Sequence, residues 1–179
     1  RVRSVMTKVG TAERSDCPIA NNSSSQESEA LAMSSAIAGT VLLKNDNAAL
    51  PLGLTAGLRV AVVGAAASDP EIVAGNGSGH VNGGGKVVTA LDGIRAALSR
   101  ERQANAAVLH SPGHEDPHFA ATVNDSDVVV VVLATNSGEG SDRKNLDLDG
   151  DADELVAAAA SHACAACPVI VVCVAPGPF

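Results

Sequence analysis

Aromatic side chains are almost absent from the sequence. Only Phe119 and Phe179 occur among its 179 residues, and it contains no Trp and no Tyr. Stacking of nucleic-acid bases or of sugar rings requires aromatic faces. We therefore expect no function that depends on aromatic platforms within this chain.

Positive charge is also scarce. The formal net charge is -8, because 12 Lys and Arg residues stand against 20 Asp and Glu residues. Proteins that bind nucleic acids carry basic patches that neutralise phosphates. The composition therefore predicts that nucleic acid is not a partner.

Long apolar runs are missing as well. The longest are residues 128–135 and 169–176, whereas a membrane-spanning helix needs about 20 apolar residues. The sequence begins with Arg1 rather than Met, and no signal-peptide pattern follows. We expect no membrane partner, we expect the sequence to be a segment of a longer protein, and its cellular compartment cannot be inferred.

Short apolar strands and helices alternate along the chain. Strands are predicted at residues 41–43, 58–64, 106–109, 127–133 and 169–174, and helices at residues 27–38, 89–100, 117–124 and 151–167. The strand at 127–133 has six successive apolar residues, which indicates burial on both of its faces. The pattern predicts an α/β fold, a mostly parallel sheet with helices on both faces, incomplete at its C-terminus.

The composition changes near residue 26. A polar run of small residues at positions 21–25 is typical of a linker. We expect residues 1–26 to be the end of a preceding domain with a linker, and residues 27–179 to be part of an α/β sandwich domain.

The glycine-rich segment after the strand at 58–64 does not match a nucleotide-binding pattern. No register of its glycines fits G-x-G-x-x-G, and no phosphate-binding loop with Lys-Ser or Lys-Thr occurs. We expect no nucleotide cofactor. The segment is interpreted either as a tight surface loop or as a pocket wall formed by Gly75, Asn76, Gly77, Ser78 and Gly79.

The loop at residues 136–146 contains the main candidate for chemistry. Glu139 lies between two glycines directly after a buried strand, and ligands of open parallel sheets bind outside the carboxyl ends of strands. Partial burial there would raise the pKa of a carboxyl group, as a general acid requires. Asp142 and Arg143 are expected to pair and support the loop. The alternative is a solvated glutamate with no chemical role.

The cysteines give a weaker signal. Cys164 and Cys167 are expected on the helix at 151–167 and Cys173 in the following strand, where thiols serve as small core residues. A zinc site would need a second pair of ligands at matching spacing. We expect no metal and no redox role.

Two further patterns resemble metal sites only in part. The acidic run at 147–153 has Ala152 and Ala158 where a calcium loop needs Gly and Glu, so it is interpreted as helix-capping residues. His110, His114 and His118 recur every four residues, but prolines and a glycine interrupt the helix that would align them. A loop is expected there instead.

Several segments in order resemble one known family. They are residues 30–46 (ALAMSSAIAGTVLLKND), 50–52 (LPL), 59–64 (RVAVVG), 75–79 (GNGSG), 90–94 (ALDGI), 127–133 and 137–146 (SGEGSDRKNL). Together they resemble the second domain of glycoside hydrolase family 3, of the β-glucosidase type.

The resemblance implies a retaining exo-β-glycosidase that acts on β-glycosides without a cofactor. Members of the family form their site between a (β/α)8 barrel and an α/β sandwich. The barrel supplies an Asp nucleophile, and the sandwich in many members supplies the general acid/base, a role that falls here on Glu139. The nucleophile usually precedes Trp, and this chain has no Trp. We therefore expect a barrel of the same protein as partner, and no activity from the 179 residues alone.

Two other classes of function stay open on the sequence. One is a carbohydrate-binding or regulatory module that has the fold without catalysis. The other is an unrelated α/β nucleotide-binding or redox domain.

Overall fold

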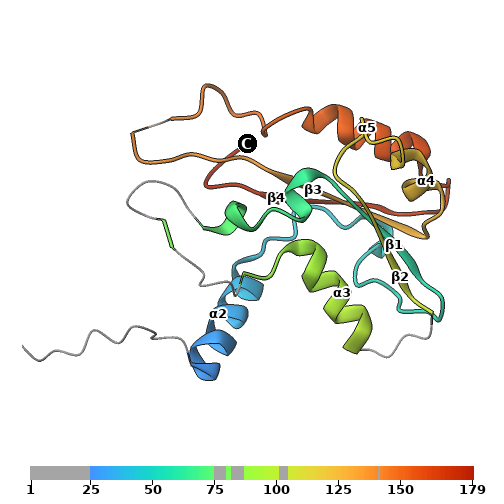
Figure 1. Cartoon of the computed structure of the whole chain (residues 1–179), viewed down its shortest axis with the longest axis horizontal. Coiled ribbons are helices and arrows are strands. Elements are labelled where there is room, and N and C mark those ends of the chain that lie inside the picture. Colours follow the sequence, from blue (N-terminus) through green and yellow to red (C-terminus); the bar gives the residue numbers. More distant parts are fainter. Residues whose placement is uncertain (1–24, 75–79, 82–86, 101–104, 141) are drawn as a thin grey trace, which may run out of the picture. The chain divides into compact units, whose positions relative to one another are not determined.

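The computed structural model describes residues 25–74, 80–81, 87–100, 105–140 and 142–179 (Figure 1). The chain divides into two units, residues 1–47 and 48–179. Each unit is described by itself.

The described part of the first unit is dominated by helix α2 (Gln26–Gly39). Ser25 and Ser28 form a reciprocal capping box, with Ser25 N donating to Ser28 Oγ at 2.7 Å and Ser28 N to Ser25 Oγ at 3.1 Å. The helix predicted at 27–38 is thus confirmed. The strand predicted at 41–43 is wrong: these residues adopt no regular structure and pair with none of the described strands, and Leu43 is exposed.

The second unit is built on a four-stranded parallel sheet. Its strands are β1 (Arg59–Val63), β2 (Ala107–Ser111), β3 (Val128–Ala134) and β4 (Val169–Val174), in the order β2-β1-β3-β4. All three neighbouring pairs are parallel. The predicted α/β fold with a parallel sheet is therefore confirmed.

Both faces of the sheet are covered. On one face, α4 (Phe119–Asn124) and α5 (Ala152–His162) pack against alternate strand residues such as Val63 and Val131. On the other face, α3 (Ala90–Arg100) and the short 3-10 helix η2 (Ala65–Ala67) pack against residues such as Val62. Because the side chains of a strand alternate between faces, the unbroken apolar sequence of β3 fills both clusters.

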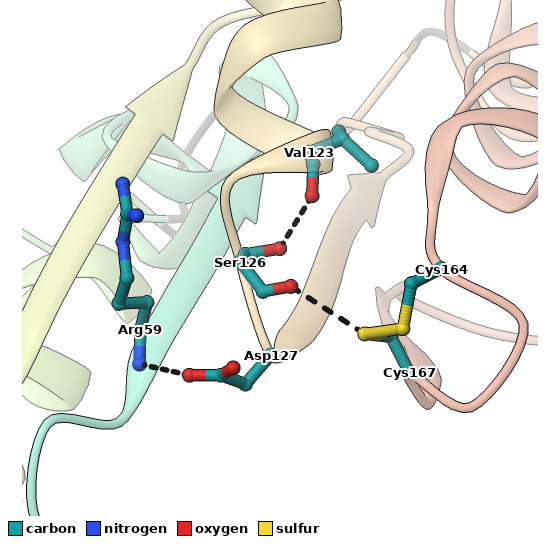
Figure 2. Close-up of a disulfide and its surroundings, with 6 residues drawn as sticks. All are labelled: Arg59, Val123, Ser126, Asp127, Cys164 and Cys167. Carbon is teal, nitrogen blue, oxygen red and sulfur yellow. Dashed lines mark hydrogen bonds between the residues drawn. A yellow bond between two sulfur atoms is a disulfide. The ribbon is translucent and has the colours of Figure 1, made fainter.

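The amino ends of β1 and β3 are tied together. Arg59 N donates to Asp127 Oδ2 at 2.8 Å (Figure 2). Asp127 N donates in return to Arg59 O at 2.8 Å. The Arg59 guanidinium also lies 3.4 Å from Asp125 Oδ2. These contacts fix the register at the end of the sheet opposite the strands' carboxyl termini.

A disulfide joins Cys164 and Cys167 in the turn before β4 (Figure 2). The prediction that these cysteines are core thiols on a helix is therefore wrong. Helix α5 ends at His162, five residues earlier than predicted, and Ala163 is already extended. Pro168 disfavours helical geometry at the preceding residue, Cys167, which explains part of the early end. Cys173 is a free thiol, as expected, and burial raises its pKa.

Candidate site at the carboxyl end of the sheet

A pocket of about 380 Å³ opens at the carboxyl ends of the strands. It is lined by residues that follow β1 (Gly64 to Ala66 and Asp69), follow β2 (Pro112 to Glu115), end β3 (Val132 to Ala134, with Asn136) and lead into α5 (Asp149 to Ala152, with Leu155). Strand β1 has β2 on one side and β3 on the other. The pocket therefore lies where the strand order reverses, the usual place for ligands in open α/β sheets.

Gly64 shapes the floor of this pocket. Its φ is +110°, and a Cβ atom there would lie 2.3 Å from the carbonyl oxygen of Val132. Gly64 N donates to Ser111 O at 3.0 Å. Only a residue without a side chain lets the three strand ends come this close together.

The turn after β2 is held by Asp116. Its Oδ2 accepts a hydrogen bond from the buried hydroxyl of Ser111 at 2.8 Å, and its Oδ1 accepts one from His118 N at 3.0 Å. The His118 backbone N–H, followed by the Ser111 hydroxyl, holds the pKa of the Asp116 carboxyl below its ordinary value of 3.8. The turn presents His114 and Glu115 to the pocket, with His114 Nε2 3.0 Å from Glu115 Oε1.

The three histidines do not converge. His110 lies in β2, where Nδ1 donates to Val62 O at 2.8 Å, so the predicted loop is wrong for this residue. His118 precedes the first residue of α4. Within the described residues, no group of three or more His, Cys, Asp or Glu side chains could hold a metal ion.

Glu139 lies in the loop between β3 and α5, as expected. Its side chain is exposed, and it does not belong to the lining of the pocket. The neighbouring Gly140 has a φ of +75°, so the sharp turn that the two glycines predict is present. The loop thus starts at the predicted edge of the sheet, where Asn136 lines the pocket, but Glu139 itself is not part of the lining.

The expected pairing of Asp142 with Arg143 is wrong. Arg143 Nη2 donates instead to the carbonyl oxygen of Pro178, and no ion pair joins the two residues in the described part of the chain. Arg143 therefore supports the loop by binding the segment after β4. The proposed pocket wall, Gly75, Asn76, Gly77, Ser78 and Gly79, lies outside the described residues.

Sequence reasoning missed the role of Asp149. In the acidic run at 147–153, Asp151 occupies the N-cap position of α5 but its side chain makes no capping hydrogen bond. Asp149 instead accepts hydrogen bonds from Thr135 and Asn136, the two residues that directly follow β3. No local pattern indicates a contact across 14 residues, but the rule that strand ends form sites could have drawn attention to Thr135.

None of the helices described is long and apolar enough to cross a membrane.

The chain resembles solved β-glucosidase structures. It is 31% identical to the β-D-glucoside glucohydrolase from Trichoderma reesei, with 75% of this chain covered and a TM-score of 0.62. It is 26% identical to the β-glucosidase from Chaetomella raphigera, with 86% covered and a TM-score of 0.71. A β-glucosidase mutant from Listeria innocua, in complex with laminaribiose, shares the fold at 20% identity and a TM-score of 0.69, with 94% covered.

The chain spans only 21%, 24% and 23% of the length of these three structures. No curated protein matches its sequence. A family model described as the C-terminal domain of glycosyl hydrolase family 3 matches residues 40–179. That match covers the whole of the sheet and the loop that carries Glu139, and the chain therefore belongs to glycosyl hydrolase family 3, as a C-terminal domain.

Proposed function

We propose that this chain contributes Glu139 as the general acid/base of a retaining exo-β-glycosidase. The observation that carries the proposal is the place of Glu139, in an exposed loop at the carboxyl end of β3 within a chain of this family. The Asp nucleophile would come from a barrel domain of the same protein. In this proposal residues 1–26 end that preceding domain and link it to a sandwich domain at 27–179.

The proposed chemistry uses one carboxyl group twice. Glu139 first protonates the departing glycosidic oxygen while the nucleophile attacks the anomeric carbon. It then removes a proton from the water that releases the sugar from the covalent intermediate. Such a reaction places the two carboxyl groups about 5 Å apart, and an exposed loop can present Glu139 to a second domain.

Two relatives support a proposal for the substrate class. The Trichoderma reesei relative is a β-D-glucoside glucohydrolase, and the Listeria innocua structure holds laminaribiose. We therefore take β-linked glucosides as the substrates and laminaribiose as a natural probe.

The test replaces Glu139 by Ala in the full-length protein. A phenyl β-glucoside needs protonation of its leaving group, so its kcat/KM should fall by about 10²- to 10⁴-fold. A dinitrophenyl β-glucoside leaves without a proton, so its kcat/KM should change little. Azide should raise kcat on the dinitrophenyl substrate, because it replaces the water that Glu139 no longer activates.

The matched control is Glu154→Ala, which removes an exposed carboxyl group from the first turn of α5. It should leave kcat/KM on both substrates unchanged. Equal losses on both substrates for Glu139→Ala, or no loss at all, would overturn the acid/base role and favour a domain that binds carbohydrate without catalysis. Hydrolysis of either glucoside by the 179-residue chain alone would contradict the need for a barrel.

A further inference from the structure

The loop that carries Glu139 is closed at its base by Asp149. Oδ1 of Asp149 accepts a hydrogen bond from Thr135 Oγ1 at 2.9 Å, and Oδ2 accepts one from Asn136 N at 3.0 Å. The backbone N–H of Asp149 donates to Ala134 O at 3.0 Å. Three hydrogen bonds thus join the residue that ends the loop to the three residues that begin it.

The beginning of the loop is itself anchored in the sheet. Thr135 is 4% exposed, and its backbone N–H donates to Val174 O at 3.1 Å, which continues the pairing of β3 with β4. At the other end, Leu148 packs against the core cluster that contains α5. Asp149 therefore connects two fixed points, and the residues between them form a loop of defined span.

A general acid must lie within hydrogen-bonding distance of the atom it protonates. Glu139 lies three residues beyond Asn136 and next to Gly140, whose φ is +75°. Glu139 is thus only three residues from the anchored base of the loop, so a displacement of that base shifts the carboxyl group as well. Displacement of a reacting group by about 1 Å can cost about 10²-fold in rate.

We propose that Asp149 is a positioning residue for Glu139: by closing the base of the loop it holds the acid/base carboxyl group in place. This inference rests on the proposed function of Glu139. Asp149 itself touches neither the nucleophile nor the scissile bond in this role.

The experiment compares Asp149→Ala with Asp149→Asn in the full-length protein, using the phenyl and dinitrophenyl β-glucosides. Alanine removes both side-chain hydrogen bonds. Asparagine can keep both, because its amide oxygen accepts from Asn136 N and its amide nitrogen donates to the Thr135 hydroxyl. We expect Asp149→Ala to lower kcat/KM on the phenyl substrate by about 10- to 100-fold, and Asp149→Asn to restore most of it.

The dinitrophenyl substrate separates positioning from general damage. Its kcat/KM should change by less than about threefold in Asp149→Ala, because that leaving group departs without a proton. A purely structural defect would lower kcat/KM equally on both substrates, and that result would overturn the inference. Asp153→Ala, which removes an exposed carboxyl group from the first turn of α5, is the matched control and should leave both values unchanged.

Two further measurements keep the inference falsifiable. Hydrogen exchange at the Asn136 amide should accelerate in Asp149→Ala and not in Asp149→Asn. If Asp149→Ala does not fold, Thr135→Val removes one of the two side-chain hydrogen bonds, and it should show the same selective loss of kcat/KM on the phenyl substrate, but a smaller one.

If Glu139→Ala shows the leaving-group dependence and the Asp149 and Thr135 variants do not, the inference fails while the proposed function stands. If Glu139→Ala itself shows no leaving-group dependence, the proposed function fails, and the inference that rests on it fails too.

Discussion

Gly64 combines a backbone conformation and a close contact that no other residue satisfies. Its φ of +110° is strained for any side chain, and the Val132 carbonyl oxygen lies only 2.3 Å from where a Cβ atom would be. Gly64→Ala should lower the free energy of unfolding by about 3 kcal/mol or more, from backbone strain together with displacement of β3. Urea unfolding of the chain measures this change. The transition is monitored by far-UV circular dichroism, because the chain has no tryptophan to serve as a fluorescent probe.

Two other glycines serve as controls for Gly64. Gly57 has a φ of +80° with no atom near its missing side chain, so Gly57→Ala isolates the backbone strain at about 1 to 2 kcal/mol. Gly53 has neither constraint, and Gly53→Ala should be close to neutral. Equal effects at all three positions would contradict the role assigned to the Val132 contact.

At the level of single residues, only part of the candidate site could be predicted from the sequence. Glu139 could be placed in a loop after β3, because a buried strand followed by glycines is a local pattern. The partner of Arg143 could not be predicted, since Pro178 lies far along the chain. The same holds for Asp149, whose contacts with Thr135 and Asn136 arise only once the loop has closed.

Among the elements, helix α5 and the turn after it differ most from expectation. The alanine-rich sequence favours a helix through residue 167, and helix propensity alone gives no reason to stop earlier. The disulfide and Pro168 give the turn its own structure, which composition does not reveal. Four of the five predicted strands are present, because they are short apolar runs bounded by polar or small residues. Residues 41–43 have the same apolar character but no described partner strand.

The disulfide should stabilise this turn modestly. It closes a loop of only four residues, from Cys164 to Cys167, so the loss of unfolded-state entropy is worth about 2 kcal/mol at most. The double variant Cys164→Ala/Cys167→Ala should therefore unfold at a lower urea concentration than the wild type. Reductant should lower the wild-type midpoint toward that of the variant and leave the variant unchanged. A reductant effect of equal size in both would place the stabilising bond elsewhere.

For the second unit as a whole, burial on both faces of the sheet is the main source of stability. Val62 and Val63 are adjacent in β1, point to opposite faces and are both fully buried. Val62→Ala and Val63→Ala should each lower the free energy of unfolding by about 2 to 3 kcal/mol, because apolar burial is lost and a cavity is left behind. Val88→Ala, at a side chain 69% exposed, should cost almost nothing. A large loss at only one of the two buried positions would mean that one face of the sheet is open to solvent.

The strand order also determines how the second unit must fold. Every neighbouring pair joins distant parts of the chain: Arg59 is opposite Ala107, Val60 opposite Val128, and Val129 opposite Val169. Among the described strands no hairpin is available as a first step, so loops of roughly 40 to 70 residues must close before their ladders form, which favours slow folding. During synthesis β1 emerges first and has no strand to pair with until β2 follows. Its apolar sequence then stays accessible to chaperones and to other chains for longer than any later strand.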